Sequence, residues 1–515
     1  MVNEKYALVS VYDKEGIVEF CRNLSDLGYK IISTSGTYKL LRESGIEVIE
    51  VSSITGFPEI LDGRVKTLHP VIHGGILYRD KEDHKSQIAT YGIPNIEIVV
   101  VNLYPFEGTV RKTSNLEEIV ENIDIGGPTL VRSAAKNFER VLVVTDKSDY
   151  SAVIERLRNG ENTLEFRINL ATKAFNHIAR YDAVIASFFS NYSSEKFPEE
   201  TAIPLRKILS LRYGENPHQS ASAYALFTLD KVLSVFSGEV LWGKELSYNN
   251  ILDSDVALEM VKAFSSENFC CIIKHNTPSG AGIGRTLYEA YEKAFKCDPI
   301  SAFGGIVGFS QKVTKELAER FVETFYEVVI APDYEDEALG ILKGKKNLRI
   351  IRVKNLDYQH GRFEMRSING GVLLQEKDSL VEEIRRCRVV TTRKPSEDEW
   401  LDLQFAWKVV MFVKSNAIVI AKNLSTIGIC GGQTSRIDSV RIAIEKAKRM
   451  GFSLEKAVCA SEAFFPFKDS VELLAKEGIT AIIQPGGSVR DDESIEEANR
   501  NGIAMVFTGV RHFRH

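Results

Sequence analysis

The sequence lacks a long apolar segment. None of its runs approaches the roughly 18 consecutive apolar residues of a membrane span, and its first residues lead into a short predicted strand without a basic region or an apolar signal core. Its seven cysteines are odd in number and form no CxxC pair, which argues against a disulfide framework and against a cysteine zinc site. We therefore expect a cytoplasmic protein without membrane contact.

An excess of one charge is also missing. Lys and Arg number 65 against 70 Asp and Glu, so the formal net charge is −5. This balance argues against a general nucleic-acid binder, whereas local clusters of cations still allow anionic metabolites as ligands. The 515 residues exceed what one hydrophobic core supports, and we expect about two to four domains.

The first 150 residues contain a repeated pattern, in which an apolar run is followed by a polar or glycine-bearing turn and then by a helical pattern. The apolar runs cover residues 6–11, 29–32, 96–101 and 141–145. Strands that alternate with helices predict an α/β fold with a parallel sheet. Ligands of such sheets bind beyond the carboxyl ends of the strands, where these turns lie.

Three segments of this region carry groups that suit a phosphate. Residues 33–37 combine hydroxyl side chains with the backbone N–H groups of a helix start, although ordinary helix capping explains them equally well. If the chain is extended there, Arg64 and Lys66 project from one face, and an anion between them would relieve their repulsion; a solvated basic loop is the alternative. Arg132 and Lys136 lie four residues apart on a predicted helix, and a bound anion would remove their mild repulsion.

Residues 269–280 organise the second half of the chain. Five apolar residues predict a short buried strand, and we expect Pro278 and Gly280 to form the turn that follows. Lys274 and His275 stand at the end of this strand. A lysine beside a histidine disfavours the doubly charged state and thus favours a neutral imidazole, which suits a general base next to a cationic stabiliser. A polar strand end with a solvated lysine is the alternative interpretation.

Other segments mark boundaries and further candidate sites. Residues 190–201 lose periodicity and become polar, which predicts a linker and hence domains at 1–195 and 196–515. Residues 335–362 mix charges and glycines, and we interpret them as a peripheral segment that contains one strand at 348–353. Residues 461–469 present three phenylalanines around a proline, either as a core corner or as the wall of a ligand pocket. The cationic end of the chain, residues 511–515, needs docking to have an ordered role.

Taken together, these motifs resemble the bifunctional purine biosynthesis protein family, which joins an IMP cyclohydrolase to an aminoimidazole carboxamide ribonucleotide (AICAR) formyltransferase. The resemblance spans nearly the whole chain in order. The motifs that carry it are Arg64-Val-Lys-Thr-Leu-His-Pro70, Asn102-Leu-Tyr-Pro-Phe106, Asp124-Ile-Gly-Gly127, Ala134-Ala-Lys-Asn137, Leu211-Arg-Tyr-Gly-Glu-Asn-Pro-His-Gln219, Lys274-His275, Phe464-Phe-Pro-Phe467 and Arg511-His-Phe-Arg-His515.

The resemblance implies an α/β fold with a methylglyoxal-synthase-like cyclohydrolase domain at 1–195 and a transformylase region of two cytidine-deaminase-like lobes at 196–515. It implies formyl transfer from the co-substrate 10-formyltetrahydrofolate to AICAR, followed by dehydrative ring closure of formyl-AICAR to IMP. No HxE…PCxxC zinc signature occurs in the sequence, in keeping with transfer without a catalytic metal. The family's transformylase sites are shared between subunits, so we expect a homodimer that acts on small molecules rather than on nucleic acid.

The resemblance also implies roles for individual residues. His275 would draw a proton from the weakly nucleophilic amine, and Lys274 would stabilise the tetrahedral oxyanion. In the cyclohydrolase, Lys136 would donate a proton with help from Lys66, Tyr104 and Asp124. The residues implied around the cyclohydrolase nucleotide are Tyr12, Asp13, Lys14, Thr34, Ser35, Gly36, Thr37, Arg64, Thr67, Asn102, Ile125 and Gly126. Those implied for the transformylase substrate are Arg212, Tyr213, Gly304, Glu327, Asn416, Arg436, Arg511 and His515, and those on the folate side are Ala463, Phe464 and Pro466.

The sequence departs from the family at three of these places. Ser35 replaces a glycine that is common in the phosphate turn, which leaves a positive φ at this position open. Thr277 stands where many members carry Asn or Ser, and Glu327 where some carry Asp. Two rival functions also stay open at this stage: a methylglyoxal-synthase-like lyase that eliminates phosphate, and a nucleotide-sensing module fused to a scaffold.

Overall fold

The computed structural model describes residues 4–229, 231–379 and 383–515. The chain forms two compact units, one of Met1–Arg206 with Ala225–Leu229 and the other of Lys207–Tyr224 with Asp230–His515. The division falls just after the polar segment 190–201 in which we expected a linker. Among the described residues, no helix combines the length and the apolar character that crossing a membrane would require.

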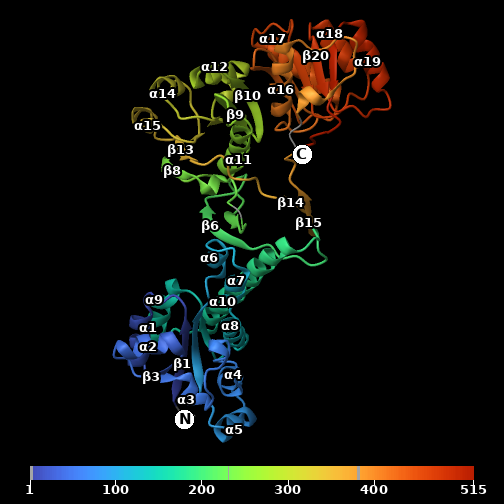
Figure 1. Cartoon of the computed structure of the whole chain (residues 1–515). Coiled ribbons are helices and arrows are strands. Elements are labelled where there is room, and N and C mark those ends of the chain that lie inside the picture. Colours follow the sequence, from blue (N-terminus) through green and yellow to red (C-terminus); the bar gives the residue numbers. More distant parts are fainter. Residues whose placement is uncertain (1–3, 230, 380–382) are drawn as a thin grey trace. The chain divides into compact units, whose positions relative to one another are not determined.

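The first unit contains a five-stranded parallel sheet, as predicted, with the order β3-β2-β1-β4-β5. Its core strands are almost wholly apolar because helices cover both faces; Figure 1 shows α1, α2 and α9 on one side and α4, α8 and α10 on the other. The strands are β1 Lys5–Val11, β2 Tyr29–Ser33, β3 Val48–Glu50, β4 Ile96–Asn102 and β5 Leu142–Val144. The helices are α1 Ile17–Asp26, α2 Ser35–Glu43, α3 Val51–Thr55, α4 Pro70–Leu77, α5 Glu82–Thr90, α6 Phe106–Val110, α7 Leu116–Glu121, α8 Gly126–Lys136, α9 Tyr150–Asn159 and α10 Leu164–Phe189.

The order of this sheet reverses at its centre. The chain runs outward from β1 through β2 to β3, and then returns to the other side of β1 for β4 and β5. The carboxyl ends of β1 and β4 therefore form a topological switch point, where open parallel sheets bind their ligands.

The second unit consists of two lobes with the same sheet topology. The first lobe has the order β10-β9-β11-β12-β13-β8, and the second, from its opposite edge, has the equivalent order β18-β17-β19-β20-β21-β16. In each lobe the two strands of a hairpin are antiparallel, and the next three strands are parallel to one another. The two-lobed fold implied by the resemblance is thus confirmed.

The elements of the first lobe are β8 Glu239–Trp242, α11 Tyr248–Ala263, β9 Phe269–Lys274, β10 Thr277–Ile283, α12 Leu287–Cys297, α13 Pro299–Ala302, β11 Ile306–Phe309, α14 Lys315–Phe321, β12 Val328–Ala331, α15 Asp336–Lys343 and β13 Arg349–Arg352. Those of the second lobe are β16 Arg388–Val389, α16 Glu397–Val410, β17 Ile418–Ala421, β18 Thr426–Cys430, α17 Arg436–Arg449, β19 Val458–Ser461, α18 Asp469–Lys476, β20 Ala481–Gln484, α19 Asp491–Arg500 and β21 Ala504–Phe507. The two lobes share one hydrophobic core, to which α11 and α16 both contribute.

One sequence-based interpretation of this unit is wrong. We expected residues 335–362 to be peripheral, but β13 is an inner strand that pairs with β12 on one side and β8 on the other. The charges that suggested a surface segment lie mostly in the flanking loops, whereas Ile350 and Ile351 are fully buried.

Two hairpins lie outside these sheets. They are formed by β6 Leu205–Leu211 with β7 Ala221–Leu226, and by β14 Phe363–Ile368 with β15 Gly371–Glu376. The short 3-10 helices are η1 Leu61–Gly63, η2 Lys147–Asp149, η3 Ser190–Tyr192, η4 Val235–Ser237 and η5 Ile384–Arg386.

Candidate active site

A cavity of about 1040 Å³ opens at the switch point of the first unit, where β1 and β4 end. It brings together most of the residues that the resemblance implied for the cyclohydrolase. Those that line it are Tyr12, Lys14, Thr34, Ser35, Gly36, Thr37, Arg64, Lys66, Thr67, Asn102, Tyr104, Asp124, Ile125 and Gly126.

The start of α2 forms one wall of this cavity. Thr34 is its N-cap residue, and Ser35 has a φ of 32°, so the positive φ expected of the family's glycine is kept by a serine. Thr37 accepts a hydrogen bond from Lys14 Nζ at 2.9 Å and donates one to the Val11 carbonyl at 3.1 Å. Burial lowers the pKa of Lys14, Asp13 opposes this change and the charge of Lys66 adds to it. A helix start beside a buried lysine is suited to bind a phosphate.

Arg64 and Lys66, between which we predicted an anion, each contact a carboxylate of the protein. Arg64 contacts Glu121 through Nε at 2.7 Å and Nη2 at 2.6 Å, while Lys66 Nζ lies 2.8 Å from Glu59 Oε1. Ser35 also donates to the Glu59 carboxylate at 2.6 Å. The segment is not extended at Arg64, which directly follows η1 with φ of −65° and ψ of −24°, and each cation has its own carboxylate.

Asp124 lies where α8 begins. Its Oδ1 accepts the Gly127 N–H at 2.8 Å, and its own N–H donates to the Tyr181 hydroxyl at 2.9 Å. Burial raises the pKa of Asp124, while the backbone hydrogen bonds of Gly127 and Tyr104 and the charge of Lys66 oppose this shift. A Cβ on Gly127 would lie 2.5 Å from Asp124 Oδ2, so a larger residue here would displace the Asp124 carboxylate.

Lys136 and Asp13, which the resemblance implied for the cyclohydrolase, are not among the residues that line this cavity. Lys136 is the last residue of α8, ten positions from Gly126, which corresponds to about 15 Å along the helix axis. The carboxylate of Asp13 forms a salt bridge with Lys147 at 2.9 Å, and its backbone is held by the Asn102 side chain. Within one chain, α8 therefore carries Lys136 away from the cavity that its first turn borders.

The Lys274–His275 pair lies at one edge of the first lobe. Lys274 ends β9 and its Nζ donates to the Phe303 carbonyl at 2.9 Å, beside Gly304. His275 is exposed and, with Asn276, forms the two-residue turn of the hairpin, since both have positive φ, 55° and 57°. Our prediction that Pro278 and Gly280 make this turn is wrong.

Pro278 and Gly280 both lie within β10. The proline is tolerated because β10 is an edge strand of its sheet, and a shift in the pairing register occurs between the two residues.

A second cluster of this lobe surrounds Arg349, a residue that the sequence analysis did not identify. Glu327 accepts a hydrogen bond from Asn250 at 2.6 Å and lies 4.0 Å from Arg349 Nη1. Burial lowers the pKa of Arg349, Glu327 opposes this shift, and the charge of Arg212 adds to it. The structure thus gathers Arg212 and Glu327, which we predicted from separate motifs, around one buried guanidinium. An arginine within the apolar run 348–351 was the available signal.

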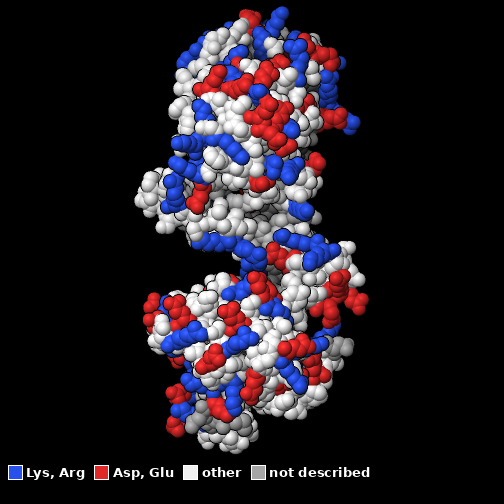
Figure 2. All heavy atoms as spheres, turned by 90° about the vertical axis from the view of Figure 1, so that its left-hand side faces the viewer, with Lys and Arg blue, Asp and Glu red and all other residues white. Residues whose placement is uncertain are grey.

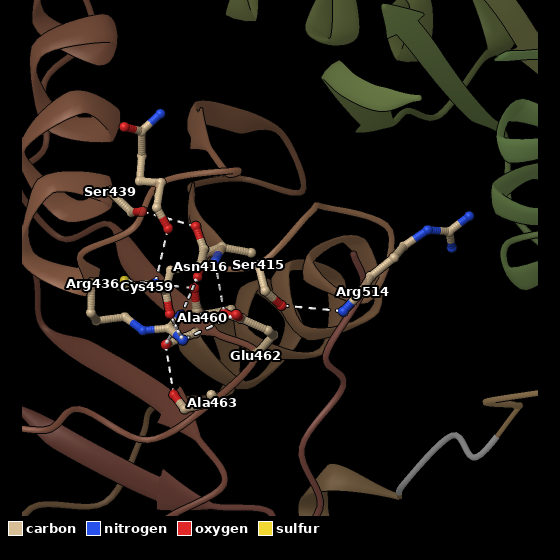
Figure 3. A network of polar contacts seen from close by, with 12 residues as sticks. Ser415, Asn416, Arg436, Ser439, Cys459, Ala460, Glu462, Ala463 and Arg514 are labelled. Carbon is tan, nitrogen blue, oxygen red and sulfur yellow. Dashed lines mark hydrogen bonds and ion pairs between the residues drawn. The ribbon is translucent and has the colours of Figure 1, made fainter. Parts of the chain in front are cut away.

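In the second lobe, Arg436 is part of a buried polar network (Figure 3). Its Nη2 donates to Asn416 Oδ1 at 2.7 Å, and both Nη atoms contact Glu462, whose side chain is fully buried. Glu462 Oε2 also accepts the Ala417 N–H at 3.0 Å. Arg436 therefore fixes Asn416 and the end of β19, and its guanidinium contacts the protein rather than the open surface. Glu462 was not among the residues predicted from the sequence.

The residues of the aromatic segment 464–467, next to this network, differ in how deeply they are buried. Phe465 is fully buried in the core, whereas Phe464 and Pro466 are half-buried and Phe467 is exposed. Phe464 and Pro466 therefore remain available as one wall of a ligand pocket.

The cationic end of the chain is docked on the second unit. Ser415 donates its N–H to the Arg514 carbonyl at 2.8 Å, and the Arg514 N–H donates to Ser415 Oγ at 3.2 Å. His512 is buried, with Nδ1 2.7 Å from Asp378 Oδ2 and its ring against Trp407. The condition that we set for an ordered tail is thus met, and Arg511 and His515 flank the docked residues.

Within residues 4–229, 231–379 and 383–515, no three or more His, Cys, Asp or Glu side chains gather in an arrangement that could hold a metal ion.

Comparisons with known proteins match both units. A family profile described as AICARFT/IMPCHase bienzyme matches residues 134–446, and one described as an MGS-like domain matches residues 16–129. Three relatives are each named bifunctional purine biosynthesis protein PurH. The protein of Aquifex aeolicus is 54% identical, covering 99% of this chain and 100% of its own length; that of Persephonella marina is 53% identical, covering 99% of each. The protein of Caldicellulosiruptor saccharolyticus is 52% identical, covering 99% of this chain and 100% of its own length. The chain therefore belongs to the AICARFT/IMPCHase family of bifunctional purine biosynthesis proteins.

Proposed function

We propose that this chain catalyses the last two steps of IMP synthesis in two separate sites, the first reaction in the second unit and the second in the first unit. AICAR takes a formyl group from 10-formyltetrahydrofolate, and formyl-AICAR then closes its ring with loss of water. The observation that carries this conclusion is the full-length match to bifunctional relatives, together with a distinct cluster of ionisable groups in each unit.

For formyl transfer, the residues at the edge of the first lobe support an acid–base mechanism. The AICAR amine attacks the formyl carbon, the exposed His275 takes the amine proton, and the carbon–nitrogen bond to the folate breaks as that nitrogen is protonated. Lys274 Nζ, oriented by the Phe303 carbonyl, would stabilise the oxyanion of the tetrahedral intermediate. Arg212, Tyr213, Gly304 and Glu327 would bind the ribonucleotide.

In the second lobe, Asn416 would contact the ligands, and Arg436 would position Asn416 rather than contact substrate. Ala463, Phe464 and Pro466 would border the folate, with Arg511 and His515 of the docked tail near the ribonucleotide.

For ring closure, the cavity of the first unit supplies the groups. The start of α2 with Lys14 would bind the phosphate, and the closing reaction is intramolecular, so that holding amide and formyl group together removes much of the barrier. Lys66 and Asp124 line the cavity, and the raised pKa of Asp124 suits proton transfer. We therefore favour Lys66 over Lys136 as proton donor, and Lys66→Ala should reduce cyclisation more than Lys136→Ala does.

We also propose a homodimer with transformylase sites shared between subunits. Two-stranded hairpins are marginally stable alone, and both isolated hairpins expose apolar side chains, among them Leu209 and Tyr224 in one and Val372 and Leu373 in the other. A second copy would cover this surface. Transferase activity per chain should fall on dilution below the dissociation constant, and sedimentation should show monomers there; a monomer that stays active at every dilution would contradict the proposal.

The partners we propose are small molecules in the cytoplasm, without nucleic acid or membranes. The net charge of −5 supports this, as does the face in Figure 2, where basic and acidic side chains are interspersed over both units. The direct test of the function is spectrophotometric turnover with AICAR and 10-formyltetrahydrofolate. Phosphate release from dihydroxyacetone phosphate would support a lyase instead, and tight IMP binding without turnover would support a sensor.

A further inference from the structure

Both lobes of the second unit use the same device to build their first hairpin. In each lobe the hairpin is preceded by a helix whose N-cap serine forms a capping box, α11 after Ser247 and α16 after Ser396. The sixth residue of each helix is an aspartate, Asp253 in the first lobe and Asp402 in the second. Each aspartate contacts the two-residue turn that joins the first two strands of its lobe.

The contacts are equivalent in the two lobes. Asp253 accepts the N–H of His275 at 3.3 Å through Oδ2 and that of Asn276 at 2.7 Å through Oδ1. Asp402 accepts the N–H of Asn423 at 2.9 Å through Oδ2 and that of Leu424 at 2.6 Å through Oδ1. In both lobes one carboxylate thus holds two successive backbone amides of a turn.

The turns need this support because of their backbone conformation. Their four residues have φ between 54° and 57°, the left-handed region that glycine adopts freely, that Asn276 and Asn423 tolerate, and that residues such as His275 and Leu424 avoid. None of the four is glycine. Hydrogen bonds to an ionised acceptor are among the strong ones, and a carboxylate that accepts both amides can hold a turn that its own residues disfavour. Burial raises the pKa of both aspartates, and the two backbone hydrogen bonds oppose that shift.

The two turns differ in what they carry. In the second lobe, Lys422 Nζ donates to the Glu455 carbonyl, and the Asn423 carbonyl accepts from Lys293 Nζ at 2.9 Å, so that the backbone of the turn is tied to neighbouring segments while the Asn423 side chain is exposed. In the first lobe the corresponding residue is His275, whose side chain is exposed. Both lobes therefore have a turn held by an aspartate, and only the turn of the first lobe carries an imidazole side chain.

We propose that Asp253 is a positioning residue for formyl transfer, which acts through the backbone of the turn to fix where the His275 imidazole meets the substrate amine. This inference rests on the proposed role of His275 as the base. Asp253 contacts amides of the turn, so its loss should affect the rate of transfer rather than the binding of AICAR.

The test compares Asp253→Ala with Asp402→Ala, which removes the same two hydrogen bonds from the second lobe. Asp253→Ala should lower kcat for formyl transfer by about 10- to 100-fold, the effect of misplacing a reacting group by about 1 Å, with KM for AICAR changed by less than about twofold. Asp402→Ala should lower Tm comparably and keep kcat within about threefold of the wild-type value, because its turn carries no reacting group. Cyclisation of preformed formyl-AICAR should be unchanged in both variants and reports that the first unit is folded, whereas the Tm of the second unit reports the fold of the part that carries the substitutions.

A second variant shows whether Asp253 acts through the turn. Adding Asn276→Gly to Asp253→Ala supplies a residue that adopts positive φ without steric cost, and it should restore part of the lost kcat. Equal losses of transfer in the two alanine variants, an unchanged kcat in Asp253→Ala, or no recovery with glycine would each overturn the inference. Retention of formyl transfer in His275→Ala would instead overturn the proposed function, so the two failures are distinguishable.

Discussion

The buried pair of Arg436 and Glu462 should contribute to the stability of the second unit, and the size of this contribution follows from the burial of both side chains. The Glu462 side chain is fully buried and that of Arg436 is 5% exposed, so neither charge has water to replace its partner. Glu462→Gln keeps the shape of the side chain but removes its charge. Breaking a buried pair from one side typically costs 3–5 kcal/mol, and because the remaining amide oxygen still accepts a hydrogen bond, we expect about 3 kcal/mol.

Calorimetry can measure this cost, since the two units should give separate transitions. A loss of about 3 kcal/mol should lower the Tm of the second unit by about 6 °C and leave that of the first unit unchanged. Glu472→Gln is the matched control, because Glu472 pairs with Lys468 at an exposed site and its loss should cost less than about 1 kcal/mol.

A double variant separates charge from packing. Arg436→Met with Glu462→Leu removes both charges and should cost less than either single change. Equal Tm values for Glu462→Gln and Glu472→Gln would refute the reasoning, because they would mean that the buried carboxylate contributes no more than a solvated one.

Three further predictions concern the first unit. Glu59→Gln removes a carboxylate that lies beside the start of α2, where the phosphate is proposed to bind. Titration calorimetry should show IMP binding about fivefold tighter at low salt, corresponding to about 1 kcal/mol, and a smaller gain at high salt. Weaker binding would show that Glu59 contacts the ligand favourably. Gly127→Ala should abolish cyclisation but leave formyl transfer intact, because its Cβ would meet Asp124 and Leu103 at 2.5 and 2.8 Å; an active cyclohydrolase would contradict the required geometry. Burial raises the pKa of Asp124, so its ionised form lowers the stability of the fold above the folded-state pKa and has no effect below the unfolded value near 3.9. Asp124→Asn should therefore raise Tm at pH 7 but not at pH 3.5. A gain in Tm that persists at pH 3.5 would argue against this titration.

The parts of the fold that could be predicted from sequence are those with strong local periodicity. Apolar runs followed by helical patterns predicted the parallel sheet, and hydroxyl-rich and basic turns predicted the groups around its switch point. These signals are local, because the residues that make a strand or bind at its end lie next to one another in sequence. Lys274 and His275 were found for the same reason, at the end of the buried strand β9.

What could not be predicted depends on residues far apart in the chain. The hairpin turn lies at His275–Asn276 rather than at Pro278 because Asp253, on the preceding helix, holds its amides. Arg436, at the start of α17, turned inward because Glu462, directly after β19, neutralises it. Lys136 and Gly126 belong to motifs that are close in sequence, but they lie at opposite ends of α8. The motifs alone did not show that this helix separates the two residues.

In our proposal one chain carries out two chemistries at separate sites, with His275 at the centre of the first. The most direct measurement is both activities in one preparation of His275→Ala: formyl transfer from 10-formyltetrahydrofolate to AICAR, and conversion of preformed formyl-AICAR to IMP. We predict that formyl transfer falls by at least about 100-fold while cyclisation keeps the wild-type rate. Wild-type formyl transfer in this variant, or the loss of both activities in a folded protein, would contradict the account.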